Sequence, residues 1–227
     1  MRKHTGKFGS RSLAFKEMRN INLPWRSVLH LGRRAEYRKG HHVHVNLALH
    51  FLDRGSVRLT HWSLDGVEKI LWYIEEGCLF GEVPCFDPLP AENLFVCAKH
   101  CVIYIFSREC VDNIARTRPD LLINLLQSMA CKMRHMAHHA SALYLDTALV
   151  RLCKFLAHRL EPGSDPPLAR IDLSQREISC LLGMNRISLY RILRQQEENG
   201  MLGPVEGNKI TILKPDEFFR LAECQSR

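Results

Sequence analysis

The chain has 227 residues and a mass of 26.2 kDa, which fits one large domain or, more often, two ordinary ones. Hydrophobic residues make up 46% and charged residues 25% of the chain, a normal globular balance that excludes wholesale disorder. The formal net charge is +8, but residues 1–46 alone hold 11 Lys and Arg against 2 Asp and Glu. A nucleic-acid function must therefore rest on a local cluster elsewhere in the chain.

The sequence favours a cytoplasmic protein that does not enter a membrane. No window approaches the roughly 18 apolar residues of a membrane span, and the basic start at Met1–Lys7 leads into no apolar signal region. Nine cysteines are scattered without any C-x2-C pair, which speaks against a zinc ribbon, a thioredoxin motif or a typical iron–sulfur run. We expect reduced thiols, many of them acting as small core residues.

The first half of the chain predicts a β-rich domain. Residues 1–20 are a basic tail with at most one short helix around Leu13–Met18, and residues 21–46 are transitional. From residue 47 to residue 106, short apolar runs alternate with turn residues. This texture is typical of a small antiparallel barrel or jelly roll.

Two features support this interpretation. Asp65-Gly66 lies between the apolar runs Ser56–Trp62 and Lys69–Ile74, and Asp-Gly in that position is a strong hairpin signal. Residues 102–106 are apolar at every position, so both faces of that strand should be covered.

A long helix is predicted to begin at Pro119-Asp120. Its apolar positions are separated by steps of 4, 3, 4, 3, 4 and 3 residues, an unbroken heptad seam. Since a helix in a single-domain core usually has a wider apolar stripe, we favour the same helix of a second subunit as its partner over intramolecular packing. The predicted dimer interface is Leu122, Leu126, Met129, Met133, Met136, Ala140 and Leu143.

The C-terminal part predicts a compact helical module. Asp146 can cap a further helix, and residues 161–167 are typical of a surface loop. Ser174 and Glu177 then form a capping box that starts a short helix. Gly183 ends it, and Asn185 can cap a second helix that begins at Arg186 and runs to about residue 199.

Helix, glycine turn and helix is the helix-turn-helix pattern, whose second helix presents its N-terminal side chains to base edges in the major groove. Between Gly183 and Gln196 there are three arginines and no acid, and arginine can grip guanine or clamp a phosphate. Residues 203–213 add a β-hairpin wing. We prefer this interpretation to a generic helical hairpin with a solvated basic face. The predicted DNA contacts are Ser174, Gln175, Asn185, Arg186, Ile187, Ser188, Tyr190, Arg191, Arg194 and Lys209.

Over roughly residues 35–215 the chain resembles the Crp/Fnr family of bacterial transcription regulators. The resemblance is specific only through the combination of several segments. These are residues 37–40, 55–59, 65–66 and 77–82, Asp146, and residues 185–186 and 191–193.

The resemblance implies an α+β fold with four parts. After the tail come a β-roll like that of cyclic-nucleotide-binding domains at residues 21–110, a dimerisation helix at 111–145 and a winged helix-turn-helix at 146–227. It also implies a hinge near Asp146, double-stranded DNA with a roughly palindromic site, a homodimer, RNA polymerase as protein partner, and allosteric control by a small effector.

Individual positions both match and depart from the family pattern. Arg186 and Arg191 match its two recognition-helix arginines, and Ser188 matches a small hydroxyl position. Ile187 stands where the family often has a glutamate that reads cytosine; an isoleucine can only touch a thymine methyl. Tyr190 replaces a frequent glycine, and we expect its side chain to reach a phosphate. The half-site should therefore differ from the common one.

The sensor domain departs from cAMP binding. Family members that bind cyclic nucleotides have a Gly-Glu segment followed by an Arg-Ser pair that holds the phosphate. Gly81-Glu82 is present, but Glu92 and Asn93 fall where the pair would be, and a carboxylate would repel a phosphate diester. The clustered N-terminal cysteines of the iron–sulfur branch are absent as well, since the first cysteine is Cys78.

Three kinds of signal remain open. An organic effector could bind between β-roll and long helix, in a pocket formed by Trp72, Phe80, Gly81, Glu82, Phe86, Glu92, Asn93, Met133 and Met136. Haem is a second possibility, because His41, His42, His44 and His50 are dense and imidazole is a haem ligand. Thiol redox through Cys78, Cys85, Cys97 or Cys101 is the third. We favour the organic effector and expect no metal site.

Two alternative functions belong to other classes of protein. No paired carboxylates, nucleophile elbow or P-loop appear in the sequence, so we expect no enzyme and no catalytic residue; a cupin-like metal enzyme would leave the C-terminal module without a role. The other rival is a ligand-binding module that regulates another protein and does not bind DNA.

Overall fold

A computed structural model describes residues 18–62, 68–87, 89 and 93–223. The chain forms two compact units, and the boundary between them falls between His135 and Met136. Residues 1–17 of the expected tail, most of the short helix expected around Leu13–Met18, and the Asp65-Gly66 turn lie outside the described residues. Within the described ranges, no helix is long and apolar enough to cross a membrane.

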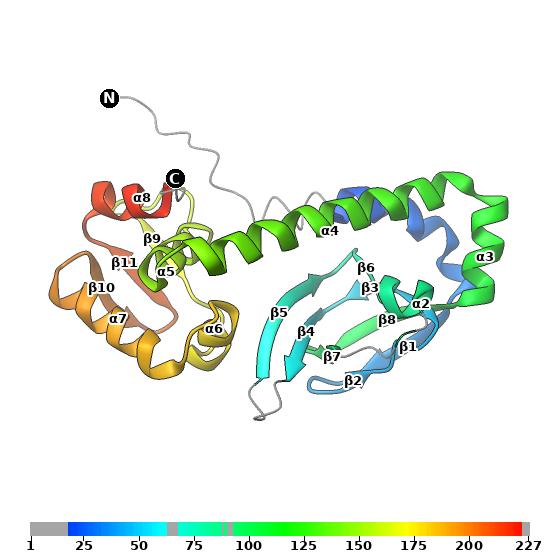
Figure 1. The fold of residues 1–227 in the computed structure, drawn as a ribbon, viewed down its shortest axis with the longest axis horizontal. Coiled ribbons are helices and arrows are strands. Elements are labelled where there is room, and N and C mark those ends of the chain that lie inside the picture. The colour runs from blue at the N-terminus through cyan, green and yellow to red at the C-terminus, as the bar shows by residue number, and fades with distance from the viewer. Residues whose placement is uncertain (1–17, 63–67, 88, 90–92, 224–227) are drawn as a thin grey trace. The chain divides into compact units, whose positions relative to one another are not determined.

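The first unit is a β-roll made of two four-stranded antiparallel sheets, with strand orders β1-β8-β3-β6 and β2-β7-β4-β5 (Figure 1). The strands are β1 (Arg33–Tyr37), β2 (His42–Val43), β3 (Ala48–Arg54), β4 (Ser56–Trp62), β5 (Glu68–Glu75), β6 (Leu79–Phe80), β7 (Asn93–Cys97) and β8 (Cys101–Ser107). The two runs predicted to flank a hairpin are β4 and β5, and they pair as expected. The transitional segment is more ordered than predicted, since it contains the 3-10 helix η1 (Leu23–Leu31) and the strands β1 and β2.

Two apolar clusters explain why β8 is hydrophobic on both faces. Ile103 and Ile105 face the space between the sheets, together with Val57, Phe80 and others. Tyr104 and Phe106 face the opposite side, where η1 and the helices α3 and α4 cover the sheet. The strand is therefore buried from both sides, which agrees with its continuous apolar run.

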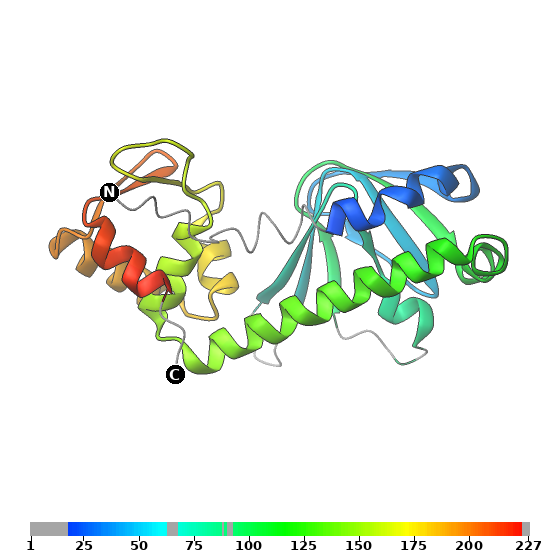
Figure 2. The same cartoon turned by 90° about the horizontal axis from the view of Figure 1, so that it is seen from above.

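Besides a helical segment at residues 18–22, three helices complete the described part of the unit. These are α2 (Glu82–Phe86), α3 (Arg108–Thr117) and α4 (Pro119–Leu145), the last continuing into the second unit (Figure 2). The predicted dimerisation segment 111–145 is thus divided, because its first residues belong to α3. Pro119 disfavours helical geometry at Arg118, which has φ −136° and ψ 68° and separates the two helices.

Helix α4 carries two different stripes. Leu121, Leu125, Ser128 and Cys131 are buried, and the first two pack against the sheet. The predicted seam begins one residue later, at Leu122, and is rotated from the buried stripe by roughly 100°. Its side chains are largely uncovered: Leu126 is 54%, Met133 70% and Met136 58% exposed.

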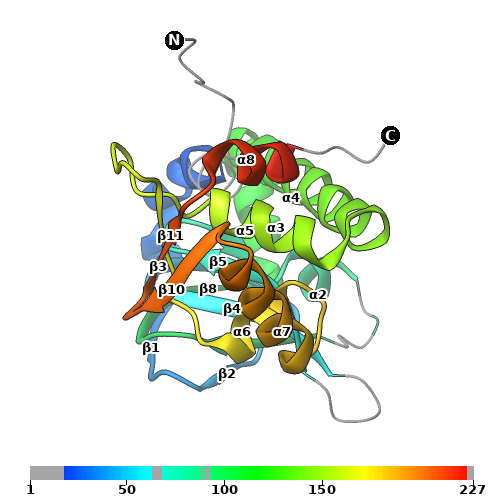
Figure 3. The same cartoon turned by 90° about the vertical axis from the view of Figure 1, so that its left-hand side faces the viewer.

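Among the described residues, the second unit contains the end of α4, four further helices and a three-stranded sheet of order β10-β11-β9 (Figure 3). Its elements are α5 (Ala148–Ala157), β9 (Leu168–Arg170), α6 (Gln175–Leu181), α7 (Arg186–Glu198), β10 (Leu202–Glu206), β11 (Lys209–Ile212) and α8 (Pro215–Glu223). The hairpin β10–β11 is the predicted wing. The predicted α+β class, with a β-roll, a long helix and a winged helix-turn-helix, is therefore confirmed.

Asp146 does not cap α5, contrary to the prediction. Thr147 is the N-cap, and its hydroxyl oxygen accepts from the Val150 amide at 3.3 Å. The buried Asp146 carboxylate instead accepts from the Lys154 ammonium at 2.8 Å. A buried carboxylate needs a charged partner, and Lys154 on α5 supplies it.

Candidate nucleic-acid interface and sensor site

Helix α6 begins at the predicted capping box. The Ser174 hydroxyl oxygen accepts from the Glu177 amide at 3.2 Å, and the Glu177 carboxylate accepts from the Ser174 amide at 2.9 Å. Ser174 therefore has a structural role at the helix start, while Gln175 beside it is exposed. The backbone amides of Ser174 and Glu177, which have no acceptor within the helix, are both hydrogen-bonded in this way.

The turn between α6 and α7 depends on Gly183. Its φ of +61° lies in the left-handed region, where glycine carries no steric penalty. A Cβ at this position would also lie 2.7 Å from Leu143 Cδ2. Two residues later, the Asn185 side-chain oxygen accepts from the Ser188 amide at 2.7 Å and caps α7, as predicted.

Helix α7 divides into an inner and an outer face. Leu189 is fully buried, whereas Ile192 and Leu193 are half-buried. The outer face, which contains most of the predicted DNA contacts, is formed by Arg186, Ile187, Tyr190, Arg191 and Arg194, all of them exposed.

The side chains of this face differ in whether they already have a hydrogen-bond or ion-pair partner. Within the described part of the chain, no hydrogen bond or ion pair holds the guanidinium of Arg186 or Arg191. The Arg194 guanidinium donates to the Tyr190 hydroxyl at 3.2 Å and lies 3.8 Å from the Glu198 carboxylate. Arg186 and Arg191 are thus free to bind an anion, while Arg194 and Tyr190 already contact each other.

The wing places Lys209 at its tip, but its ammonium is not free. Lys209 Nζ lies 3.3 Å from the Glu161 carboxylate, which also lies 3.8 Å from Arg170. A phosphate would have to replace Glu161 as the partner of Lys209. This ion pair could not be predicted from the sequence pattern, because 48 residues separate its members.

The loop before α7 is attached to the end of α4 through Arg151. Its guanidinium donates to the Leu182 carbonyl at 2.8 Å and to the Asp146 carbonyl at 2.7 Å. One side chain on α5 therefore joins the C-terminal end of α4 to the helix-turn-helix.

In the first unit, Glu82 forms a largely buried ion pair with Lys132 of α4. The Lys132 ammonium lies 2.5 Å from the Glu82 carboxylate and donates to the Leu79 carbonyl at 2.6 Å. The side chains of Glu82 and Lys132 are 10% and 19% exposed, respectively, so this pair is shielded from solvent more than a surface pair.

Comparisons with known proteins identify the two domains that contain these residues. Residues 37–118 match the family model of the cyclic nucleotide-binding domain, and residues 150–221 match that of the Crp-like helix-turn-helix domain. The chain belongs to the Crp/Fnr family of transcription regulators.

One relative of this Crp/Fnr regulator is the cAMP-activated global transcriptional regulator CRP of Pasteurella multocida, 26% identical over 180 residues, which cover 78% of this chain and 81% of that protein. Two solved structures have the same fold. They are the c-di-GMP responsive global regulator CLP of Xanthomonas campestris (TM-score 0.72, 21% identity, 82% of this chain and 96% of that one) and a mutant of CooA from Carboxydothermus hydrogenoformans (TM-score 0.72, 16% identity, 87% and 90%).

Only part of the expected effector pocket of this Crp/Fnr regulator comes together. Phe80 is buried in the core between the sheets, Trp72 packs against that core, and the Gly81-Glu82 turn follows directly. Asn93 lies beside His61, at 3.1 Å from its ring nitrogen. Glu92 is outside the described residues.

Three of the expected pocket residues lie elsewhere. Phe86 is 39% exposed and its ring lies 4.8 Å from the Arg108 guanidinium. Met133 and Met136 belong to the exposed seam of α4. The α4 residues nearer the core are Lys132 and His135, and the ring centroid of His135 is 5.8 Å from that of Trp72. The sequence does not predict that these two residues line the pocket, because their stripe of α4 contains polar residues.

The histidines of the β-roll are dispersed. His41, His42 and His44 are exposed, whereas His50 is fully buried. Burial lowers the pKa of His50 to about 4. Among the described residues, no three His, Cys, Asp or Glu side chains are placed so that they could hold a metal ion.

Proposed function

We propose that this Crp/Fnr regulator is a homodimer that binds a roughly palindromic DNA site and is controlled by a small effector other than cAMP. The observation that carries the proposal is the outer face of α7, where Arg186 and Arg191 are exposed and, within the described chain, unpaired. Such arginines can read guanine or hold phosphates in the major groove.

The dimer is supported by the seam of α4. Leu126, Met133 and Met136 are more than half exposed, although each is apolar and they recur at heptad spacing. A second copy of the same helix would cover them. Two recognition helices would then enter successive major grooves, ~34 Å apart, and RNA polymerase would be the protein partner at the promoter.

The effector is expected next to Glu82, between the β-roll and α4. The Glu82 carboxylate is already neutralised by Lys132, and Asn93 stands where the family resemblance would place a phosphate-binding residue. Both features argue for a ligand different from a cyclic nucleotide. Binding there would favour one of two arrangements of the dimer by its difference in affinity for them.

The DNA-binding function can be tested without knowing the operator. Full-length protein is used to select sites from a randomised duplex library, and the selected duplex is then used in gel-shift titrations. We expect a site with two inverted half-sites. Arg186→Ala or Arg191→Ala should each weaken binding by about 1–3 kcal/mol, because each variant removes one guanidinium from the DNA interface.

The matched control is Arg220→Ala, because Arg220 is an exposed arginine of the same unit on α8. Its binding isotherm should not change. Failure to select any site would refute DNA reading and leave a ligand-binding module that acts on another protein. Equal binding by all three variants would refute the assignment of α7.

A further inference from the structure

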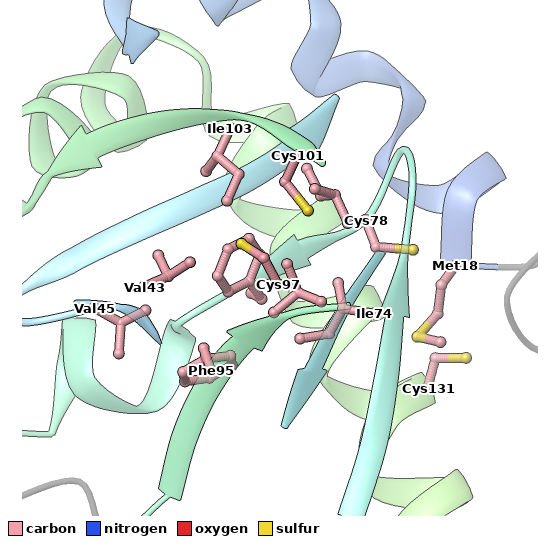
Figure 4. Packing of buried hydrophobic residues seen from close by; sticks show 13 residues of the cluster. Met18, Val43, Val45, Ile74, Cys78, Phe95, Cys97, Cys101, Ile103 and Cys131 are labelled. Carbon is pink, nitrogen blue, oxygen red and sulfur yellow. The ribbon is translucent and has the colours of Figure 1, made fainter. Parts of the chain in front are cut away.

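The space between the two sheets of the β-roll is rich in sulfur. Met18, Cys78, Cys97, Cys101 and Cys131 all belong to its apolar cluster, and each is at most 3% exposed (Figure 4). The eight cysteines among the described residues are all free thiols. They have no part in the proposed DNA binding.

Cys97 and Cys101 are a distinct pair within this cluster. Cys97 is the last residue of β7 and Cys101 the first of β8, so the short turn 98–100 connects them across the two sheets. Figure 4 shows both side chains directed into the same part of the core. Cys97 is 1% and Cys101 0% exposed.

The backbone fixes both ends of this turn. The Ser56 carbonyl accepts from the Ala98 amide at 2.8 Å and from the Cys101 thiol at 3.3 Å. The Cys97 amide donates to the His41 carbonyl at 2.9 Å. The ends of β7 and β8 that carry the two cysteines are therefore held in place by the backbone.

The two thiols also differ in acidity. The hydrogen bond between the two thiols lowers the pKa of Cys101 and raises that of Cys97. Burial raises the pKa of Cys78 and Cys85 to about 11 and that of Cys153 to about 12. Since the thiolate is the nucleophile, Cys101 is the reactive member.

We propose that Cys97 and Cys101 are a redox-active pair, which a small hydroperoxide oxidises to an intramolecular disulfide. A peptide or protein disulfide could not reach sulfurs that are at most 1% exposed, whereas hydrogen peroxide can enter during local opening. The chemical step stands independently of the proposed function; only its effect on DNA binding rests on that function.

The reaction is balanced by the peroxide alone. The Cys101 thiolate attacks one peroxide oxygen, the O–O bond breaks, and the leaving hydroxide or alkoxide takes a proton to become water or alcohol. Cys101 is then a sulfenic acid. The Cys97 sulfur attacks the Cys101 sulfur, the S–O bond breaks, and the hydroxide leaves with the Cys97 proton as water. Two thiols have given up two electrons and the peroxide has gained them.

The sequence itself provides a clean test. Lys99 lies between Cys97 and Cys101, and Glu82 and Glu92 separate Cys78, Cys85 and Cys97 from one another. Digestion with trypsin and a glutamate-specific protease therefore places each of these cysteines on its own peptide, and only a disulfide keeps two such peptides together. Reduced full-length protein is treated with hydrogen peroxide, digested without reductant and analysed by mass spectrometry. We expect a linked pair of peptides that contain Cys97 and Cys101 and that separate on reduction.

Variants assign the two roles. Cys101→Ser should abolish the reaction, leaving Cys97 as a thiol, whereas Cys97→Ser should leave Cys101 as a sulfenic acid that dimedone traps. Cys85→Ser is the matched control, because Cys85 is buried in the same unit and has a raised pKa; it should form the linked peptides normally. The rate should increase with pH, as the Cys101 thiol ionises.

Several results would overturn the pair. These are unlinked peptides in the wild type, linkage of Cys97 or Cys101 to Cys78, or dimedone labelling of another cysteine first. If a serine variant does not fold, the peptide linkage and the dimedone labelling of the wild type still test the proposal. Gel shifts of oxidised and reduced protein on the selected duplex follow: if neither state binds DNA, the proposed function fails while the disulfide result stands.

Discussion

At the scale of single residues, His50 shows how burial changes the pKa of a histidine. It lies in the middle of β3, its ring centroid is 4.9 Å from that of Phe80, and it is fully buried. Burial favours the neutral imidazole and lowers its pKa to about 4. His50 is thus a neutral core residue at physiological pH.

Acid should therefore destabilise the β-roll through His50. The pKa is depressed on folding from an ordinary 6.5, so the contribution of His50 to stability is complete above pH 6.5 and disappears as pH falls toward 4. The difference corresponds to roughly 3 kcal/mol. Denaturant unfolding at pH 7 and pH 4 should show a smaller decrease in stability for His50→Phe than for the wild type.

The exposed His41 provides the control for this measurement. His41→Phe should follow the wild-type pH dependence. If the curves of wild type and His50→Phe run parallel from pH 7 to pH 4, His50 is not a buried neutral histidine in solution.

Roles set by neighbours in sequence are predictable, and roles set by distant partners are not. The caps at Ser174 and Asn185 follow from the two or three residues after them, and the structure confirms both. The Glu82–Lys132 pair joins residues 50 positions apart, so only the fold could reveal it. The same holds for the ion pair that occupies Lys209.

At the scale of elements, α4 shows why a sequence pattern can reveal only one of the two packing faces of a helix. The heptad seam is fully apolar and is therefore visible in the sequence. The stripe that packs on the β-roll includes Ser128 and Lys132, and these polar members conceal it. Strand β8 is easier, because a run that is apolar at every position indicates burial from both sides.

The seam predicts a charge-sensitive dimer. Met133→Glu places a carboxylate at the centre of the exposed stripe, and two such charges would have to be buried together on dimerisation. We expect the variant to be a monomer at concentrations where the wild type is a dimer, measured by sedimentation equilibrium.

Gln127→Glu is the matched control, since Gln127 is exposed on the same helix and points about 120° away from Met133. It should leave the dimer intact. If Met133→Glu also remains a dimer, the subunits associate through another surface; if the wild type is a monomer, the proposed dimer is wrong.

At the scale of the whole molecule, charge is distributed unevenly. From residue 146 to the end there are 12 Lys and Arg against 11 Asp and Glu, so the DNA-binding unit has little general attraction for DNA. Its affinity must come from the few cations that are placed on one face. This restricts both the strength of binding and its dependence on salt.

We expect the logarithm of the binding constant to fall linearly with the logarithm of salt concentration, by about 0.9 for each phosphate contact. Replacing an arginine that holds a phosphate should reduce this slope by about 1, whereas one that reads a base should mainly relax sequence preference. Arg194→Ala should change the slope least, because Tyr190 and Glu198 already hold Arg194. Fluorescence anisotropy over a salt series provides the measurement, and a reduction of the slope by about 1 for Arg194→Ala would contradict this expectation.

The double hydrogen bond of Arg151 has a mechanical consequence. One guanidinium donates to both the Asp146 carbonyl and the Leu182 carbonyl. The last turn of α4 and the loop before the recognition helix must therefore move together as one rigid body. A pivot placed between Asp146 and Leu182 would break at least one of the two hydrogen bonds, so we expect the bending that re-aims the arginines of α7 to take place upstream of Asp146.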